Sequence, residues 1–527
     1  MSSGSSLAAA ATVVGVTAAA TLLISHVRGA EQRRRQQQRV RLKEALEHEL
    51  ALIIDIGSSG VRCGVYTVAV SPQLVPGAVA HVKHAIIPPN HTPADPAHAV
   101  AAVEAAVDDC LAALRRLPLP HKRVSAIGFS GLSMNLIGLG GDGRSATRLL
   151  HYADATAATA EAARDLLCEA SWTGLMDVHS MHWDKELLTV LRERGFNTAS
   201  LPQLRDFSEF TGTITAASAY ARRWPELRGA HCYLGLGDGA CANFGSGCRG
   251  AHTLAVTVGT SAAARVVLPV PLCACQAQPA TAAAGGGGGC RGGAACAGRF
   301  NVPRGLWAYR IDRHRLLLGG ALSDGGSVFE WVSHLTGATS EEELAALVSA
   351  AASMPPASHG LTVLPFLSGE RAPGWRDGAS ACVLGLRRAT TGSHLLRAGM
   401  EAVAYRLAEI VDLMGEHLEA DAQVVASGSA LQASKPWRQI LSDVLSRRVL
   451  ASSEGEATSL GAAYLLSEHQ LTIHRGARPA DPAQQMGSAE GAVSLPPERV
   501  CDPDSDAYDA HCAARARQRR LYAQLYS

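Results

Sequence analysis

Short apolar runs that end in glycine-bearing polar turns recur along this chain. The first run, Leu52–Ile54, is followed by Asp55, the turn 57–60 and a second apolar run, Val61–Val68. Short apolar runs bounded by turn residues are typical of buried strands, so this pattern predicts a β-hairpin. The same reasoning predicts further strands over 124–129, 253–258 and 424–426.

Helical periodicity fills much of the sequence between these strands. Apolar residues at helical spacing predict helices over 96–116, 436–447 and 457–469. A longer amphipathic helix carries its apolar face on Leu396, Met400, Val403, Leu407, Ile410 and Met414. Alternation of strands and helices predicts an α/β architecture.

Composition narrows the classes of function. A chain of 527 residues is long enough for several domains, and its net charge of +1 gives no overall field that would hold nucleic acid. We therefore expect no nucleic-acid partner, since binding nucleic acid would need a local basic patch. Hydrophobic residues make up 47% of the chain, which excludes wholesale disorder. The 13 cysteines are odd in number and irregularly spaced, which favours reduced thiols over a disulfide framework.

The N-terminus is set apart from the fold. Residues 7–24 carry no charge, and a cluster of arginines follows between Arg28 and Arg41. Two interpretations stay open: a single-pass membrane anchor, or a targeting peptide that is cleaved to leave a cytoplasmic or organellar (plastid or mitochondrial) protein. We expect residues 1–46 to be a leader that is not part of the folded domains.

Three turns that each follow a predicted strand carry glycine and hydroxyl residues. They are Asp55–Ser59, Gly259–Ser261 and Ser427–Ser429. Such turns expose successive backbone N–H groups without a Cβ barrier, which suits close approach to phosphate. Each alone is more often an ordinary turn, but their repetition indicates a nucleotide site.

Two acidic residues are candidates for chemistry. Asp55 ends a buried strand, where it would either initiate the turn or hold hydrated Mg²⁺, and Arg62 would lie on the paired strand. Asp238 lies between Gly237 and Gly239. An aspartate in this position can accept the proton of an attacking hydroxyl, although an Asp-Gly turn alone is an equally good explanation.

A third cluster is Asp177, His179, His182 and Asp184, in DVHSMHWD. These residues could be metal ligands, but acidic caps at an exposed helix start explain them equally well.

The ordered set of motifs resembles the FGGY family of carbohydrate kinases. The segments that carry the resemblance are LIIDIGSSGVRCGVY, AIGFSGLSMNLIGL with HYADAT, LGLGDGACANFGSG, TVGTSAAARVV, LPFLSGERAPGW and ASGSALQASKPWRQILSDVLSRRV. Within the family, GLWAYRIDRHRLLLGGALSDGG and SGERAPGW look most like gluconate kinases. The resemblance implies two RNase-H-like (actin-like ATPase) domains with a cleft between them.

The resemblance also divides the chain. The expected parts are a leader (1–46), a shortened N-terminal domain (47–266), a low-complexity Ala/Gly/Cys insert (267–300), a C-terminal domain (301–475) and a peripheral tail (476–527).

Roles for individual residues follow from the resemblance. Asp238 is the expected catalytic base and a substrate contact, and it shares Mg²⁺ with Asp55. The expected ATP-binding residues are Asp55, Gly57, Ser58, Ser59, Arg62, Gly259, Thr260, Ser261, Gly428 and Ser429. Sugar contacts are expected from Met134, Asn135 and Asp154, and the predicted cofactors are ATP and Mg²⁺.

The implied activity is ATP-dependent phosphorylation of a sugar or sugar acid, as in a gluconokinase. Arg371 or Lys185 would supply the cation for a carboxylate substrate. A neutral ketose such as xylulose or ribulose stays open. The short stretch 157–170, where the family has several dozen more residues, leaves open a pseudo-kinase that binds nucleotide or sugar without catalysis. Homodimerisation and membrane association through residues 7–24 are also left open.

Overall fold

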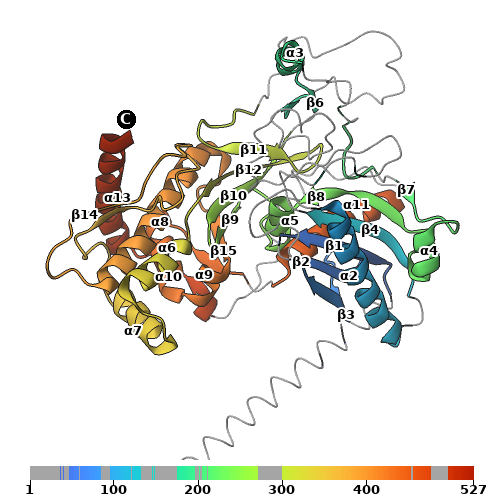
Figure 1. Cartoon of the computed structure of the whole chain (residues 1–527), viewed down its shortest axis with the longest axis horizontal. Coiled ribbons are helices and arrows are strands. Elements are labelled where there is room, and N and C mark those ends of the chain that lie inside the picture. Colours follow the sequence, from blue (N-terminus) through green and yellow to red (C-terminus); the bar gives the residue numbers. More distant parts are fainter. Residues whose placement is uncertain are drawn as a thin grey trace, which may run out of the picture.

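The computed structural model describes residues 47–58, 60–84, 95–119, 122–131, 175–195, 204–209, 212–270, 300–452, 455–475 and 497–526, with a few isolated positions. The described residues form two α/β domains, each built on one large sheet (Figure 1). This agrees with the predicted alternation of strands and helices.

The N-terminal sheet has the strand order β3-β2-β1-β4-β8-β7. Its strands are β1 (Leu50–Gly57), β2 (Gly60–Thr67), β3 (Leu74–Lys83), β4 (Val124–Gly131), β7 (Gly212–Thr213) and β8 (His231–Gly237). The first three strands form an antiparallel meander, and β4 and β8 extend it in parallel beside β1.

The C-terminal sheet repeats this plan, with the order β11-β12-β10-β9-β15-β16-β17. Its strands are β9 (Thr253–Val258), β10 (Ala262–Pro269), β11 (Trp307–Arg310), β12 (Arg315–Leu322), β15 (Gln423–Ser427), β16 (Val449–Ala451) and β17 (Val500–Cys501). Here β9, β10 and β12 form the meander, and β15 and β16 continue it in parallel. The two domains therefore share one topology.

Helices cover the faces of both sheets. Those near the N-terminal sheet are α2 (Pro96–Arg116), α4 (Ala219–Arg223) and α5 (Asp238–Gly245), while α3 (Lys185–Glu193) follows the small hairpin β5 (Met176–Asp177) and β6 (His182–Trp183). The C-terminal domain carries α6 (Ser327–Thr336), α7 (Glu341–Ala352), α8 (Gly392–Met414), α9 (Ser429–Ala433), α10 (Lys435–Leu445), α13 (Ser505–Tyr526) and the hairpin β13 (Thr362–Leu364) and β14 (Cys382–Leu384). Within the described part of the chain, no helix is long and apolar enough to cross a membrane.

One helix joins the two domains. Helix α11 (Ala457–Arg475) follows β16 of the C-terminal sheet, yet Figure 1 shows it among the blue strands of the N-terminal domain. Its buried Leu465 and Leu466 belong to the same core cluster as Ile53 of β1 and Ala126 of β4. Since α2 packs on the other face of this sheet, the N-terminal sheet is covered on one side by a helix from far along the chain.

Helices α5 and α11 cross at two glycines. A Cβ on Gly461 would lie 1.7 Å from the carbonyl oxygen of Cys241, and a Cβ on Gly245 would lie 1.8 Å from that of Ala457. Both distances are far inside van der Waals contact. The two helix backbones therefore meet directly, with no layer of side chains between them.

The C-terminal segment packs against the C-terminal domain. Strand β17 pairs with β16, and α13 buries polar groups against α8 and its neighbours. The Tyr522 hydroxyl donates to Glu370 at 2.6 Å, His511 contacts Tyr405 at 2.9 Å, and Gln518 donates to the carbonyl of Val363 at 2.7 Å. The part of the expected tail that the structure describes thus belongs to the packed domain.

We predict that Gly461→Ala destabilises the protein by about 3 kcal/mol, because the added methyl group forces the two helices apart. An alanine in an ordinary helix would have the opposite effect, a gain of about 1 kcal/mol. Chemical denaturation measures the change. Gly378→Ala is the control, since a Cβ there meets nothing within 4 Å. Equal stability of the two variants would contradict the direct backbone contact.

Candidate active site

Strand β1 delivers Asp55 to the boundary between the domains. Asp55 pairs with Arg62 across the β1–β2 hairpin, as predicted, and its carboxylate lies 3.5 Å from the Arg62 guanidinium. Arg62 also lies 3.5 Å from Glu456, the residue immediately before α11. The side chain of Asp55 is 5% exposed, whereas those of Arg62 and Glu456 are about 40% exposed. The ion pairs therefore join a buried carboxylate to the surface.

Burial dominates the ionisation of Asp55. It raises the pKa of this carboxyl from 3.8 to about 6, although Arg62 and the neighbouring Ser130 hydroxyl act to lower the pKa. The carboxylates of Asp238 and Glu456 raise the pKa further. Asp238 follows β8, and β4 separates β8 from β1 in the sheet. Among the described residues, no group of three or more His, Cys, Asp or Glu side chains is arranged to hold a metal ion. A divalent cation beside Asp55 would therefore take most of its ligands from a bound phosphate and water.

Asp238 is the first residue of α5, directly after β8. Its carboxylate accepts a hydrogen bond of 2.6 Å from the N–H of Gly239. A Cβ on Gly239 would lie 2.8 Å from the Tyr309 hydroxyl and 3.8 Å from Nε of Arg265. Glycine at 239 therefore lets β10 and β11 of the C-terminal sheet approach the start of α5.

The two remaining glycine turns meet on the C-terminal domain. Strand β9 ends at the turn Gly259–Ser261, where Thr260 and Ser261 are exposed. Gly428 has φ +87°, and a Cβ there would lie 2.4 Å from the carbonyl oxygen of Val258. Exposed Ser429 begins α9 beside it. The structure thus brings together two segments that lie some 170 residues apart, as the Thr257–Ser427 hydroxyl contact at 2.8 Å also shows.

A third segment supports this loop and was missed by the sequence analysis. The N–H groups of Gly325 and Gly326 donate to the carbonyls of Thr260 and Gly259 at 2.8 and 2.6 Å. Asp324, just before them, accepts from Ser327 Oγ at 2.9 Å and from the N–H of Ser368 at 2.8 Å. The SDGG sequence after β12 was the available signal, because paired glycines after a strand allow close backbone contact.

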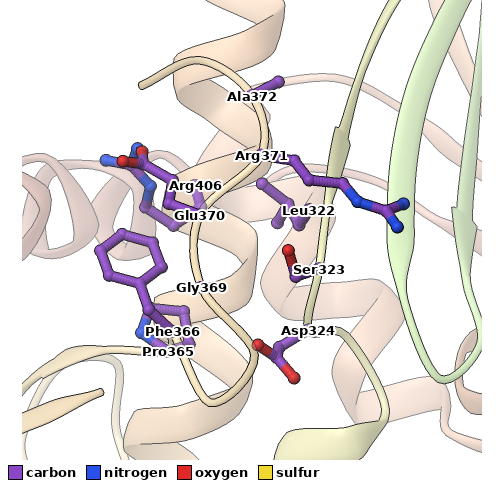
Figure 2. Close-up of a pocket in the computed structure, with 10 residues that line it drawn as sticks. All are labelled: Leu322, Ser323, Asp324, Pro365, Phe366, Gly369, Glu370, Arg371, Ala372 and Arg406. Carbon is purple, nitrogen blue, oxygen red and sulfur yellow. The ribbon is translucent and has the colours of Figure 1, made fainter. Parts of the chain in front are cut away.

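A small pocket adjoins this support (Figure 2). Leu322, Asp324 and Arg371 lie on one side of it in Figure 2, and Glu370 and Arg406 lie on the other. Glu370 is ion-paired with Arg406. Figure 2 shows Arg371 extending away from that pair.

The remaining residues predicted to bind ATP, sugar or metal lie in other parts of the chain. Gly57 and Ser58 form the turn between β1 and β2, whereas Ser59, Met134, Asn135 and Asp154 lie outside the described residues. Lys185 is exposed at the start of α3. Asp177 and Asp184 accept backbone hydrogen bonds at the β5–β6 turn and the start of α3, which is the capping role weighed against metal binding.

Residues 254–467 match the family model described as "FGGY family of carbohydrate kinases, C-terminal domain". The match begins in β9 and ends in α11. A gluconokinase of Bacillus subtilis is 26% identical over 306 residues, which cover 56% of this chain and 53% of the relative. A glycerol kinase of Nocardia farcinica is 28% identical over 315 residues, with the same two coverages. The chain thus spans about half the length of the curated relatives it matches.

Solved structures extend the likeness across both domains. A gluconate kinase from Lactobacillus acidophilus aligns with TM-score 0.70 and 19% identity over 91% of this chain and 98% of its own. A ligand-bound xylulose kinase from the same organism gives TM-score 0.69 and 19% identity over 90% and 99%. These likenesses confirm the predicted two-domain actin-like ATPase fold.

We predict that Asp55→Asn stabilises the protein at pH 7.5. The pKa of Asp55 is about 6 in the folded protein and 3.8 as a model value, so ionisation favours the unfolded chain once the pH rises through this range. Removing the charge should therefore gain up to about 3 kcal/mol at pH 7.5 and little below pH 4. Thermal denaturation at both pH values measures this. Destabilisation at both would mean that the fold requires the carboxylate.

Proposed function

We propose that this chain is an ATP-dependent kinase that phosphorylates a hydroxyl of a sugar or sugar acid. The observation that carries the proposal is the position of Asp238 at the first turn of α5. It lies at the same edge of the N-terminal sheet as Asp55, with β4 between their strands, and against β10 and β11 of the C-terminal sheet. The B. subtilis gluconokinase and N. farcinica glycerol kinase support the reaction class, since both of their names describe phosphorylation of a polyhydroxylated substrate.

Asp238 would act as the general base. It accepts the proton of the acceptor hydroxyl while that oxygen forms its bond to the γ-phosphorus of ATP, and the bond from phosphorus to the bridging oxygen of ADP breaks. The hydrogen bond from Gly239 N–H fixes one oxygen of this carboxylate. An acid held this way at a helix start is positioned by the backbone, which is the precision that proton transfer needs.

The glycine turns would hold the phosphates. Backbone N–H groups of Gly57 and Ser58 from one domain, and of the Gly259–Ser261 loop from the other, suit phosphate oxygens approached from both sides. Gly428 and Ser429 would lie beside the adenosine. We propose the same phosphate-binding role for Ser59, because it follows Ser58 in the sequence of the first turn.

Asp55 and Asp238 would bind the Mg²⁺ that accompanies ATP. Magnesium usually takes one or two carboxylates together with phosphate oxygens and water, and Asp55 and Asp238 lie at the same edge of the N-terminal sheet. When bound, Mg²⁺ supplies positive charge that offsets the charge developing on the transferred phosphoryl group. Arg62, ion-paired with Asp55, would keep this carboxylate ionised at neutral pH.

We predict that Asp238→Asn lowers sugar-dependent ADP release at least about 100-fold, since the amide cannot accept the proton. Nucleotide affinity should change little, because the amide preserves the shape of the side chain. The assay uses the purified full chain with ATP, Mg²⁺ and a panel of gluconate, xylulose, ribulose and glycerol. Calorimetric titration with ADP checks that the variant is folded.

The outcomes separate the alternatives. Stimulation by one sugar that the variant loses would support the proposal and name the substrate. Turnover that survives in Asp238→Asn would remove the assigned mechanism. ATP binding without stimulation by any sugar would favour a pseudo-kinase.

A further inference from the structure

Strand β10 carries one charged residue in an otherwise apolar sequence, AAARVVLP. Its alternate residues divide between two cores: Ala264 and Val266 belong to the core of the C-terminal domain, whereas Val267 belongs to the cluster shared with α5 and α11. By this alternation Arg265 lies on the face of β10 that is turned toward α5. The 3.8 Å from its Nε to the Cβ position of Gly239 agrees.

Arg265 has no side-chain partner in the described part of the chain, where it forms neither an ion pair nor a side-chain hydrogen bond. It is half-buried. The neighbouring elements supply little negative charge to offset that of Arg265. Strands β9 and β12 and helix α5 contain one carboxylate among them, that of Asp238. A half-buried cation without a counter-ion is energetically unfavourable, so its position points to an anionic ligand.

The surroundings of Arg265 favour a carbohydrate. Arg265 pairs with Gly319 of β12, which in turn pairs with Trp307 of β11. A Cβ on Gly319 would lie 2.6 Å from the Trp307 indole, so the ring lies over this glycine and next to Arg265. Trp307 stacks on Tyr309 with ring centroids 5.4 Å apart. An apolar aromatic wall with a few fixed polar groups is the usual lining of a small-molecule site.

Arg265 could bind either of two anions in such a site: the carboxylate of an acceptor, or the γ-phosphate of ATP. The phosphate turn ends at Ser261, and Arg265 lies four residues further along β10, about 13 Å at the rise of a strand. Asp238, which would contact the acceptor, precedes the glycine next to Arg265. The geometry therefore favours the acceptor end of the site.

We infer that Arg265 binds the carboxylate of a sugar-acid substrate and sets the preference for an acid over a neutral sugar. The inference rests on the proposed kinase function and names the substrate class. A guanidinium can bind a carboxylate through two parallel hydrogen bonds, which holds the far end of an extended sugar acid while a hydroxyl faces Asp238. It replaces Arg371 and Lys185 as the cation for this role.

The test compares Arg265→Gln, Arg265→Lys and the control Arg388→Gln, whose arginine is exposed in the loop between β14 and α8. Calorimetry without ATP measures binding of gluconate and of glucitol, its neutral counterpart. Turnover with each acceptor gives kcat, KM and the KM for ATP. We expect Arg265→Gln to weaken gluconate binding about 100-fold, and Arg265→Lys to restore part of it. Glucitol binding and the KM for ATP should not change, and Arg388→Gln should match the wild type.

Three results would overturn the inference. Equal loss for gluconate and glucitol would indicate a purely structural arginine. A raised KM for ATP with unchanged gluconate binding would assign Arg265 to the phosphate. Wild-type protein that phosphorylates only neutral sugars would refute the inference while the proposed kinase stands. Conversely, Arg265-dependent gluconate binding without phosphorylation of any acceptor would support the inference and refute the kinase.

Discussion

The direct crossing of α5 and α11 is the constraint on which the site depends. Gly245 and Gly461 each face a backbone carbonyl of the other helix, so backbone geometry sets the spacing of the two helices. Asp238 begins α5, and Glu456 stands immediately before α11. The same contact that joins the domains therefore places acids from two distant segments near Asp55. A side chain at either glycine would disturb the fold and the site together.

The pKa of a buried carboxyl in the C-terminal domain shifts in the opposite direction from that of Asp55. Buried Glu401 is contacted by Arg397 at 2.6 Å and by His359 at 3.0 Å. Burial alone would raise the pKa of Glu401, but the His359 hydrogen bond and the Arg397 charge outweigh it and hold the pKa at about 2. At the domain boundary burial dominates instead, and the pKa of Asp55 rises to about 6. Glu401 thus has two buried basic partners, whereas Arg62, the partner of Asp55, is about 40% exposed.

Local sequence patterns predicted most of the elements. The helix Pro96–Arg116 and the strand Thr253–Val258 have the predicted bounds, and Arg62 lies opposite Asp55 as the hairpin required. Periodicity and turn chemistry are properties of neighbouring residues, so they can be read without the fold. The family resemblance supplied the pairing of the two domains.

The features that could not be predicted from the sequence are contacts between residues far apart along the chain. Helix α11 has an ordinary helical pattern, and nothing local indicates that it packs on the N-terminal sheet. Gly325 and Gly326 gain their meaning only from the Gly259–Ser261 loop, which lies more than 60 residues earlier. Arg265 did break the apolar pattern of its strand, but its significance depends on α5, which is separate in the sequence. Contacts of this kind follow from tertiary packing rather than from propensity.

The route of the chain through the two domains has a consequence for biosynthesis. One face of the N-terminal sheet is covered by α11, and this helix follows nearly all of the C-terminal sheet in the sequence. During synthesis, the apolar side chains of Ile53 and Ala126 therefore stay uncovered until residues up to about 475 have left the ribosome. The first domain cannot be completed ahead of the second, so the nascent chain exposes an apolar sheet face to chaperones for most of its translation.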